Sequence, residues 1–183
     1  MTATIPYTWT IERYHQAIGA GLFVDERLEL LRGELVVMPP EHEPHAYANV
    51  EIGDLLRRLL GQQAKVREAH PITLPNNSEP MPDLAIVKPL GKVYRSRHPG
   101  AADIYWLIEI ANTSLSQDLT LKAEIYAEAG IQEYWVVDVN QLELVVLRDP
   151  QGNQYQSVQR YRSGQVSPLA FPDVQITVMD LLD

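Results

Sequence analysis

Residues 106–126 read WLIEIANTSLSQDLTLKAEIY, an apolar run followed by a turn and a segment with helical character. The run holds one charged side chain, Glu109, and the next lysine is Lys122 in the segment that follows. Strand side chains alternate between two faces, so Glu109 shares a mostly apolar face with Leu107 and Ala111. An uncompensated carboxylate there is costly. We therefore expect Glu109 to be protonated, paired, bound to a metal ion, or placed where the strand meets water.

The rest of the chain alternates between helical and strand patterns. The predicted helices cover residues 9–19, with Thr8 or Thr10 as N-cap, then 45–61, then a segment from Ser114 or Ser116 to Ala129. The predicted strands cover residues 28–38, as a hairpin turning at Arg32-Gly33, then 66–74, 83–87, 104–111 and 131–139, and finally 142–161, as a hairpin turning at 150–153. Together they indicate an α/β protein.

The order of these elements predicts one mixed β-sheet flanked by helices, with the second hairpin appended to it. A chain of 183 residues is long enough to bury a proper core as one domain, residues 1–183. We expect the core to span about residues 25–140 and a C-terminal hairpin extension to span about 141–183. A fold class assigns no function by itself, so the function must be argued from particular residues.

Composition limits the classes of function. The net charge of −9 argues against a protein that coats nucleic acid nonspecifically, because such binding depends on many Lys and Arg contacts to phosphates. No stretch reaches the roughly 18 apolar residues of a membrane span, so we expect no membrane partner. The absence of cysteine excludes disulfides and thiolate metal sites and fits a reducing compartment. We therefore expect a cytoplasmic protein.

One segment is basic although the chain as a whole is acidic. Residues 88–102, KPLGKVYRSRHPGAA, contain no acidic residue. Their positive side chains are Lys88, Lys92, Arg95 and Arg97, with His98 beside them. The segment is either a solvated loop that happens to be basic or a contact surface for phosphates. Tyr94 lies among these cations, where a phosphate or base contact is available to it.

A second acid belongs to the strand before Glu109. Asp83 opens the run DLAIV directly after Pro82, a residue that often marks the beginning of a strand. If the two strands are antiparallel neighbours, the start of one lies beside the end of the other, and Asp83 meets Glu109. Two such carboxylates favour a hard divalent cation, and Mg²⁺ is the natural candidate. The alternative is that Asp83 caps a turn and Glu109 pairs with a nearby Arg or Lys.

Pro82-Asp83 followed by Glu109 near the end of the next strand resembles the PD-(D/E)XK nuclease superfamily. In that pattern a lysine stands two residues after the second acid, whereas this chain has Ala111 there. The small side chain of Ala111 leaves room for an amine from elsewhere, and the long stem of Lys122 suits that role. The alternative for Lys122 is an exposed i, i+4 salt bridge with Asp118.

The resemblance extends beyond these residues. The run EIANTSLSQDLTLKAEIYAEAGIQEYWVVDV, residues 109–139, is similar to the "putative restriction endonuclease" family that is abundant in cyanobacteria. The segments GELVVMPP, residues 33–40, and PMPDLAIV, residues 80–87, resemble the same family, so the resemblance covers about residues 10–140. A lysine that has moved from the strand onto the helix belongs to that family's pattern.

The resemblance implies a restriction-endonuclease-like fold with Asp83, Glu109 and Lys122 as catalytic residues. Asp83, Glu109 and the main-chain carbonyl of Ile110 would hold Mg²⁺, for which Mn²⁺ can substitute. An acid from the N-terminal region can complete the metal site in this superfamily; we expect Glu34, within GELVVMPP, ahead of Glu51. Lys122 would stabilise the phosphate transition state or orient the attacking water.

Histidines are weaker candidates. His45, at the expected start of a helix, either caps that helix or contacts a phosphate, and we favour the cap. The segment EHEPH, residues 41–45, does not fit a zincin motif, because its histidines are three residues apart across Pro44 rather than four apart on a helix.

The sequence therefore predicts a metal-dependent endodeoxyribonuclease that hydrolyses phosphodiester bonds in DNA. Lys88, Lys92, Arg95 and Arg97 would flank the duplex in that case. We also expect a homodimer, because cutting both strands requires two sites related by a twofold axis. The alternative is a nuclease-fold module that has lost catalysis and binds DNA or a protein partner, which the acidic net charge favours.

Overall fold

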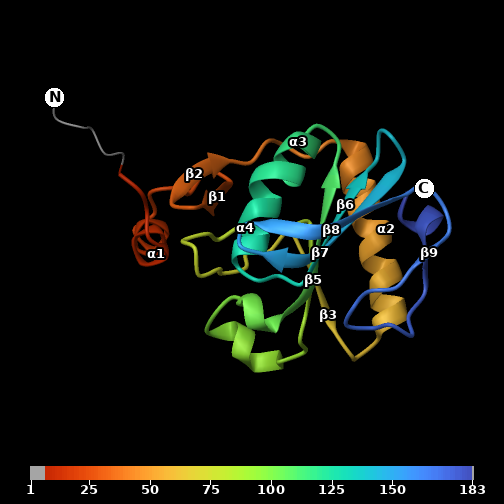
Figure 1. Cartoon of the computed structure of the whole chain (residues 1–183). Coiled ribbons are helices and arrows are strands. Elements are labelled where there is room, and N and C mark those ends of the chain that lie inside the picture. The colour runs from red at the N-terminus through yellow and green to blue at the C-terminus, as the bar shows by residue number, and fades with distance from the viewer. Residues whose placement is uncertain (1–6, 183) are drawn as a thin grey trace.

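A six-stranded mixed sheet runs through the centre of the protein, with helices on both faces (Figure 1). The computed structural model describes residues 7–182. The strands of this sheet, in spatial order, are β3 (Lys65–Glu68), β4 (Leu84–Val87), β5 (Ile104–Ala111), β6 (Glu133–Asp138), β7 (Glu143–Gln151) and β8 (Gln154–Tyr161). Neighbouring strands are antiparallel except β5 and β6, which are parallel. The predicted α/β class and mixed sheet are confirmed.

The parallel pair requires a crossover, and a helical segment supplies it. This segment consists of α3 (Leu115–Gln117), the π-helical turn η3 (Asp118–Lys122) and α4 (Ala123–Glu128), and Gly130 follows it at φ 76°. Glycine adopts this left-handed conformation without strain, as expected for the end of a helix. The crossover therefore returns the chain to the sheet beside the strand that it left.

Each face of the sheet has its own core. On one face, α2 (Glu43–Leu60) packs Ile52, Leu56 and Leu60 against a layer that includes Trp106 and Trp135. On the other, α4 packs against a layer formed by alternate residues of the same strands; Ile125, Tyr126, Leu107, Val136 and Val145 belong to it. Because β4, β5 and β6 are covered on both faces, their sequences are continuous apolar runs.

The second hairpin extends the central sheet at one edge. β7 pairs along its length with β6, and β8 then pairs with β7. Val145 and Val146 of β7 are almost completely buried, one in each core. The expected boundary near residue 140 therefore falls between two paired strands of one sheet.

Two local expectations were wrong. Residues 66–74 do not form one strand, because the chain leaves the sheet after Glu68: Ala69 has φ 46°, and Pro71 cannot donate a ladder hydrogen bond. The helical spacing of apolar residues within 45–61 also predicts Val50 on the core-facing side of α2, together with Leu55 and Leu56, but Val50 is 51% exposed.

The N-terminal part packs beside one end of the sheet (Figure 1). It contains α1 (Ile11–Gly19) and the hairpin of β1 (Leu28–Leu31) and β2 (Glu34–Val37), and Thr10 caps α1 by accepting a hydrogen bond from Arg13 N at 3.3 Å. The remaining elements are the short helices η1 (Gly91–Arg95), η2 (Ala101–Asp103) and η4 (Val178–Leu181) and the strand pair β9 (Gln165–Val166) and β10 (Ile176–Thr177). Within residues 7–182, no helix combines the length and the apolar character needed to cross a membrane.

Candidate active site

The pairing of β4 with β5 brings Asp83 to Glu109. Leu84 pairs with Ile108 in an antiparallel register, so the residue before β4 lies beside the end of β5. The main-chain N–H of Asp83 donates to Glu109 Oε2 at 3.3 Å, and the N–H of Ile110 donates to Asp83 Oδ2 at 2.7 Å. The two carboxylates predicted from the strand patterns therefore lie side by side, and the backbone of each strand holds the acid of the other.

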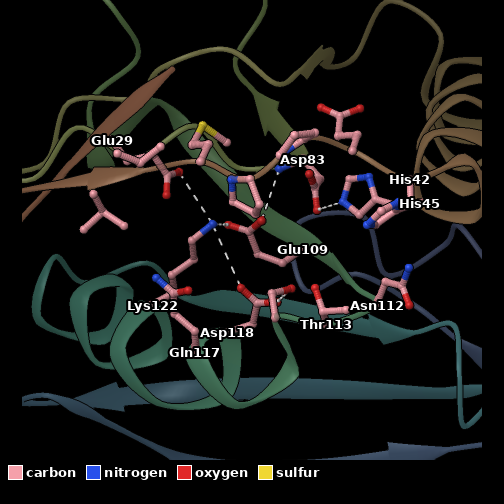
Figure 2. A pocket seen from close by; sticks show the side chains of 17 residues that line it. Glu29, His42, His45, Asp83, Glu109, Asn112, Thr113, Gln117, Asp118 and Lys122 are labelled. Atoms are coloured by element: carbon pink, nitrogen blue, oxygen red, sulfur yellow. Dashed lines mark hydrogen bonds and ion pairs between the residues drawn. The ribbon is translucent and has the colours of Figure 1, made fainter. Parts of the chain in front are cut away.

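Lys122 reaches the same place from the helical crossover. Its Nζ donates to Glu109 Oε1 at 3.0 Å, and its buried side chain belongs to the lining of the pocket that Figure 2 shows. Ala111, which stands where the superfamily pattern has its lysine, is completely buried. The lysine belongs to the π-helical turn η3, a local geometry that often occurs at functional sites.

Glu29 of β1 is the N-terminal acid that the structure brings to this site. It is 3% exposed; its Oε1 accepts a hydrogen bond from Met81 N at 2.7 Å and lies 3.5 Å from Lys122 Nζ. Glu34 and Glu51 are exposed and do not line the pocket, because Glu34 stands at the turn end of the hairpin, opposite Leu31. The signal for Glu29 was present in the sequence: like Glu109, it is one acid within an apolar strand, LELL.

Asp118 completes a ring of acids around Lys122. Its Oδ1 lies 4.0 Å from Lys122 Nζ, and its Oδ2 accepts a hydrogen bond from Ser114 Oγ at 2.6 Å. Both partners of this i, i+4 pair are buried, so it is not the exposed salt bridge considered as an alternative. Tyr126, one turn beyond the lysine, donates from its hydroxyl to Glu109 Oε1 at 2.7 Å. The sequence pattern assigns Tyr126 to the core alone and gives no sign of this contact.

His45 takes part in the site and does not cap α2. Its Nε2 lies 3.0 Å from Asp83 Oδ2, and this hydrogen bond raises the pKa of His45 although burial opposes the shift. The N-cap of α2 is His42, which makes no side-chain capping bond and also lines the pocket. The start of α2 therefore brings His45 into contact with Asp83 and places His42 in the lining of the same pocket.

Burial and charge determine the protonation of the central pair. Burial would lower the pKa of Lys122, but the carboxylates of Glu109, Glu29 and Asp118 outweigh it and raise that pKa, so the amine stays charged. Burial also raises the pKa of Glu109 well above its ordinary value, against the opposing effect of Lys122. Four acids thus surround one ammonium group, and their burial and mutual repulsion, which raise the pKa values of Glu109 and Asp118, are what a bound cation would relieve.

The acids open into a cavity of about 120 Å³, which has room for several water molecules or a hydrated ion (Figure 2). Among the residues described, Asp83 Oδ1 and Glu29 Oε2 accept no protein hydrogen bond. Carboxylate oxygens with free lone pairs, gathered at a partly open cavity, suit a hard divalent cation. The donor set therefore fits Mg²⁺ or Mn²⁺.

The basic segment lies at the opposite end of β4 and β5. It joins the end of β4 to the start of β5, whereas Asp83 precedes β4 and Glu109 is near the end of β5 (Figure 1, green segment). Lys88, five residues after Asp83, is therefore about 16 Å away along the strand. Arg97 makes an ion pair with Asp103. The four cations that we expect to flank the duplex do not line the pocket itself.

Tyr94 is held within this segment. Its hydroxyl donates to Lys88 O at 2.8 Å, and the guanidinium groups of Arg67 and Arg97 lie 5.7 and 5.9 Å from its ring centroid. These contacts hold the Tyr94 ring against the basic segment.

Comparisons with known proteins agree with the fold. A crystal structure from Anabaena variabilis ATCC 29413, described as a putative nuclease belonging to DUF820, superposes with a TM-score of 0.70 at 15% sequence identity, over 97% of this chain and 98% of that one. No curated protein matches the sequence significantly. The family model Uma2, described as "Putative restriction endonuclease", matches residues 3–179. Since the match covers nearly the whole sequence, the chain belongs to the Uma2 family, as its likeness to PD-(D/E)XK nucleases had indicated.

Proposed function

We propose that the protein is a metal-dependent endodeoxyribonuclease that hydrolyses phosphodiester bonds in DNA. One observation carries the proposal: Asp83, Glu109 and Lys122, which come from three different elements, meet at one cavity with Glu29 beside them. A merely structural ion pair needs one acid for one lysine. The surplus of carboxylates, two of them with free oxygen atoms, is what a cation site requires.

Asp83 and Glu109 would hold the Mg²⁺ ion, with the main-chain carbonyl of Ile110 and the Glu29 carboxylate as further ligands. Mn²⁺ would replace Mg²⁺. When bound, the ion supplies Lewis-acid polarisation of the phosphate and lowers the pKa of a water molecule. The protein contributes a rigid set of oxygen donors, since the backbone N–H groups of Asp83 and Ile110 fix the two central carboxylates.

Lys122 would act on the reacting phosphate. Its ammonium group is held by Glu109 at 3.0 Å and stays charged, so it can neutralise the negative charge that grows in the transition state and can orient the attacking water. Tyr126 and Asp118 position this amine through contacts to Glu109 and to Nζ itself. His45, bonded to Asp83 at the cavity, would contact a phosphate oxygen of the bound strand.

Plasmid cleavage tests the proposal. The parent protein and the variants Asp83→Asn, Glu109→Gln and Lys122→Met would be assayed with Mg²⁺, with Mn²⁺ and with a chelator, after circular dichroism has established that each is folded. We expect cleavage that depends on the metal and falls by about 10²-fold or more in every variant. Glu51→Gln, which replaces an exposed acid of α2 outside the pocket, is the matched control and should cleave like the parent.

The products also test the expected homodimer. β8 is the last strand of the sheet and is largely exposed, so it offers an edge for pairing with a second copy. A dimer with two sites would convert supercoiled plasmid to linear DNA with little nicked intermediate. Cleavage that survives all three substitutions would refute the assigned site. A folded parent that binds DNA or protein tightly without cutting would favour the inactive binding module.

A further inference from the structure

A second cluster of metal-ligating side chains lies outside the pocket of acids. His15 of α1, Glu79 of the loop before β4, and His98 of the basic segment place one ligand atom each within 4.8 Å of the others. His15 Nε2 lies 2.8 and 2.9 Å from the two carboxylate oxygens of Glu79. None of the three residues lines the pocket that contains Asp83 and Glu109. The nuclease chemistry proposed above therefore does not use them.

Glu79 is the residue that requires an explanation. It is 3% exposed, and among residues 7–182 its carboxylate pairs with no lysine or arginine. Its partners are the imidazole of His15 and the hydroxyl of Thr73, which donates to Oε2 at 2.8 Å. A buried carboxylate is costly unless a positive charge or a metal ion accompanies it. A hydroxyl and a neutral imidazole carry no positive charge, so either a proton on His15 or a bound cation has to supply it.

We propose that His15, Glu79 and His98 form a Zn²⁺ site. Two imidazoles and one carboxylate are a ligand set that zinc accepts, whereas Mg²⁺ prefers oxygen donors alone. In a tetrahedral zinc site neighbouring ligand atoms are about 3.4 Å apart, so donors already within 4.8 Å need only small side-chain movements. The Thr73 hydroxyl already provides the hydrogen bond to the carboxylate that metal ligands commonly receive from their surroundings.

The position of the cluster indicates what the metal does. Glu79 is anchored to β1 by a backbone bond from its N–H to Leu30 O, while His15 and His98 come from α1 and from the segment between β4 and β5. A bound ion therefore joins three segments that are distant in sequence. His15 is the most exposed ligand, with 47% of its side chain accessible, so the ion would also tie α1 to the body of the protein. We infer a structural role.

Positively charged side chains near the cluster limit its affinity for Zn²⁺. Arg67 acts on His98 through its charge, and Arg95 and Arg97 line the adjacent cavity. Arg97 is neutralised by its ion pair with Asp103. With three protein ligands and these cations nearby, we expect weaker zinc binding than at a four-ligand structural site.

Calorimetric titration with Zn²⁺ tests the site; saturating Mg²⁺ is included because, on the proposed function, it would occupy the pocket of acids and leave the histidines free. The parent should bind one Zn²⁺ per chain, and Zn²⁺ should raise its melting temperature through preferential binding to the folded state. His15→Gln and His98→Gln should each weaken binding by at least about tenfold. Both replace partly exposed side chains, and circular dichroism would establish that the variants are folded.

His70→Gln is the matched control, since His70 is an exposed histidine outside the cluster. It should bind Zn²⁺ like the parent, and so should Asp83→Asn, whatever its effect on DNA cleavage. Failure of the parent to bind Zn²⁺ in the presence of Mg²⁺ would overturn the proposal. So would unchanged binding in both His15→Gln and His98→Gln, or a loss confined to Asp83→Asn.

Discussion

Glu29 and Glu109 illustrate one rule at the scale of the residue. Each is the single acid of an otherwise apolar strand, and each is almost completely buried beside Lys122. A buried carboxylate is retained only where something compensates it, so an isolated acid in an apolar run indicates that a partner lies nearby in the fold. The rule identified Glu109 from the sequence and would have identified Glu29.

Replacing Glu29 tests whether it serves the reaction. Glu29→Gln keeps the acceptor for Met81 N but removes a negative charge next to Lys122 and the expected ion. A contact to a charged group contributes about 1.5–3 kcal/mol, so kcat/KM for DNA cleavage should fall at least about tenfold. Glu34→Gln, in the same hairpin but exposed, should leave kcat/KM unchanged. Equal effects of the two substitutions would remove Glu29 from the site.

The sequence predicts some contacts of the site but not those that depend on how the helices pack on the sheet. The meeting of Asp83 with Glu109 follows from antiparallel pairing of adjacent strands, and the position of Lys122 follows from the family pattern. His45 and Tyr126 could not be assigned in this way. Their contacts depend on how α2 and α4 pack on the sheet, which no local pattern encodes.

At the scale of the element, the parallel pairing of β5 with β6 decides the architecture. It obliges the chain to cross over the sheet through a helix, and this crossover delivers Lys122 to the strand end where Glu109 lies. The periodicity of residues 114–129 predicts the helix but not its π-helical turn. The hairpin of β7 and β8 was predicted correctly as a hairpin; its place in the main sheet depends on long-range pairing with β6.

The segment between β4 and β5 has a pH dependence of its own. The hydrogen bond with Arg97 lowers the pKa of Asp103, although burial opposes the shift. Its folded pKa is lower than its unfolded pKa of about 3.9, so this ion pair stabilises the fold above that pH and the stabilisation is lost as pH falls through the folded pKa.

Asp103→Asn should therefore be less stable than the parent at neutral pH, and the difference in unfolding free energy should shrink below about pH 4. Urea unfolding at a series of pH values measures this difference. If the difference in unfolding free energy stayed the same in strong acid, the charge of Asp103 would contribute nothing to stability.

At the scale of the whole molecule, the acids and the basic segment occupy opposite ends of two strands. The separation of about 16 Å corresponds to roughly five phosphates along one DNA strand, so one duplex can reach both places. The basic segment would then hold the substrate at a distance from the reacting bond. The rest of the protein carries an excess of negative charge, which repels DNA. The cations of the basic segment are therefore more important to DNA binding.

Lys92→Gln combined with Arg95→Gln tests this arrangement, because both side chains are exposed and far from the pocket of acids. The loss of two phosphate contacts should reduce the slope of log affinity against log salt by about 2, and KM should rise while kcat stays constant. Arg162→Gln, an exposed cation at the end of β8, is the control. Unchanged KM and salt slope in the double variant would exclude the segment from DNA binding.

The lysine of the site comes from a helix and not from the strand of the second acid, and this matters for searches of genome sequences. A search that demands lysine two positions after the second acid discards this chain at Ala111, although a lysine 13 positions downstream meets the same carboxylate. Relatives whose helical lysine has been lost would look identical to this chain under such a filter. Scoring position 122 rather than position 111 would separate genes that retain the amine from those that have lost it.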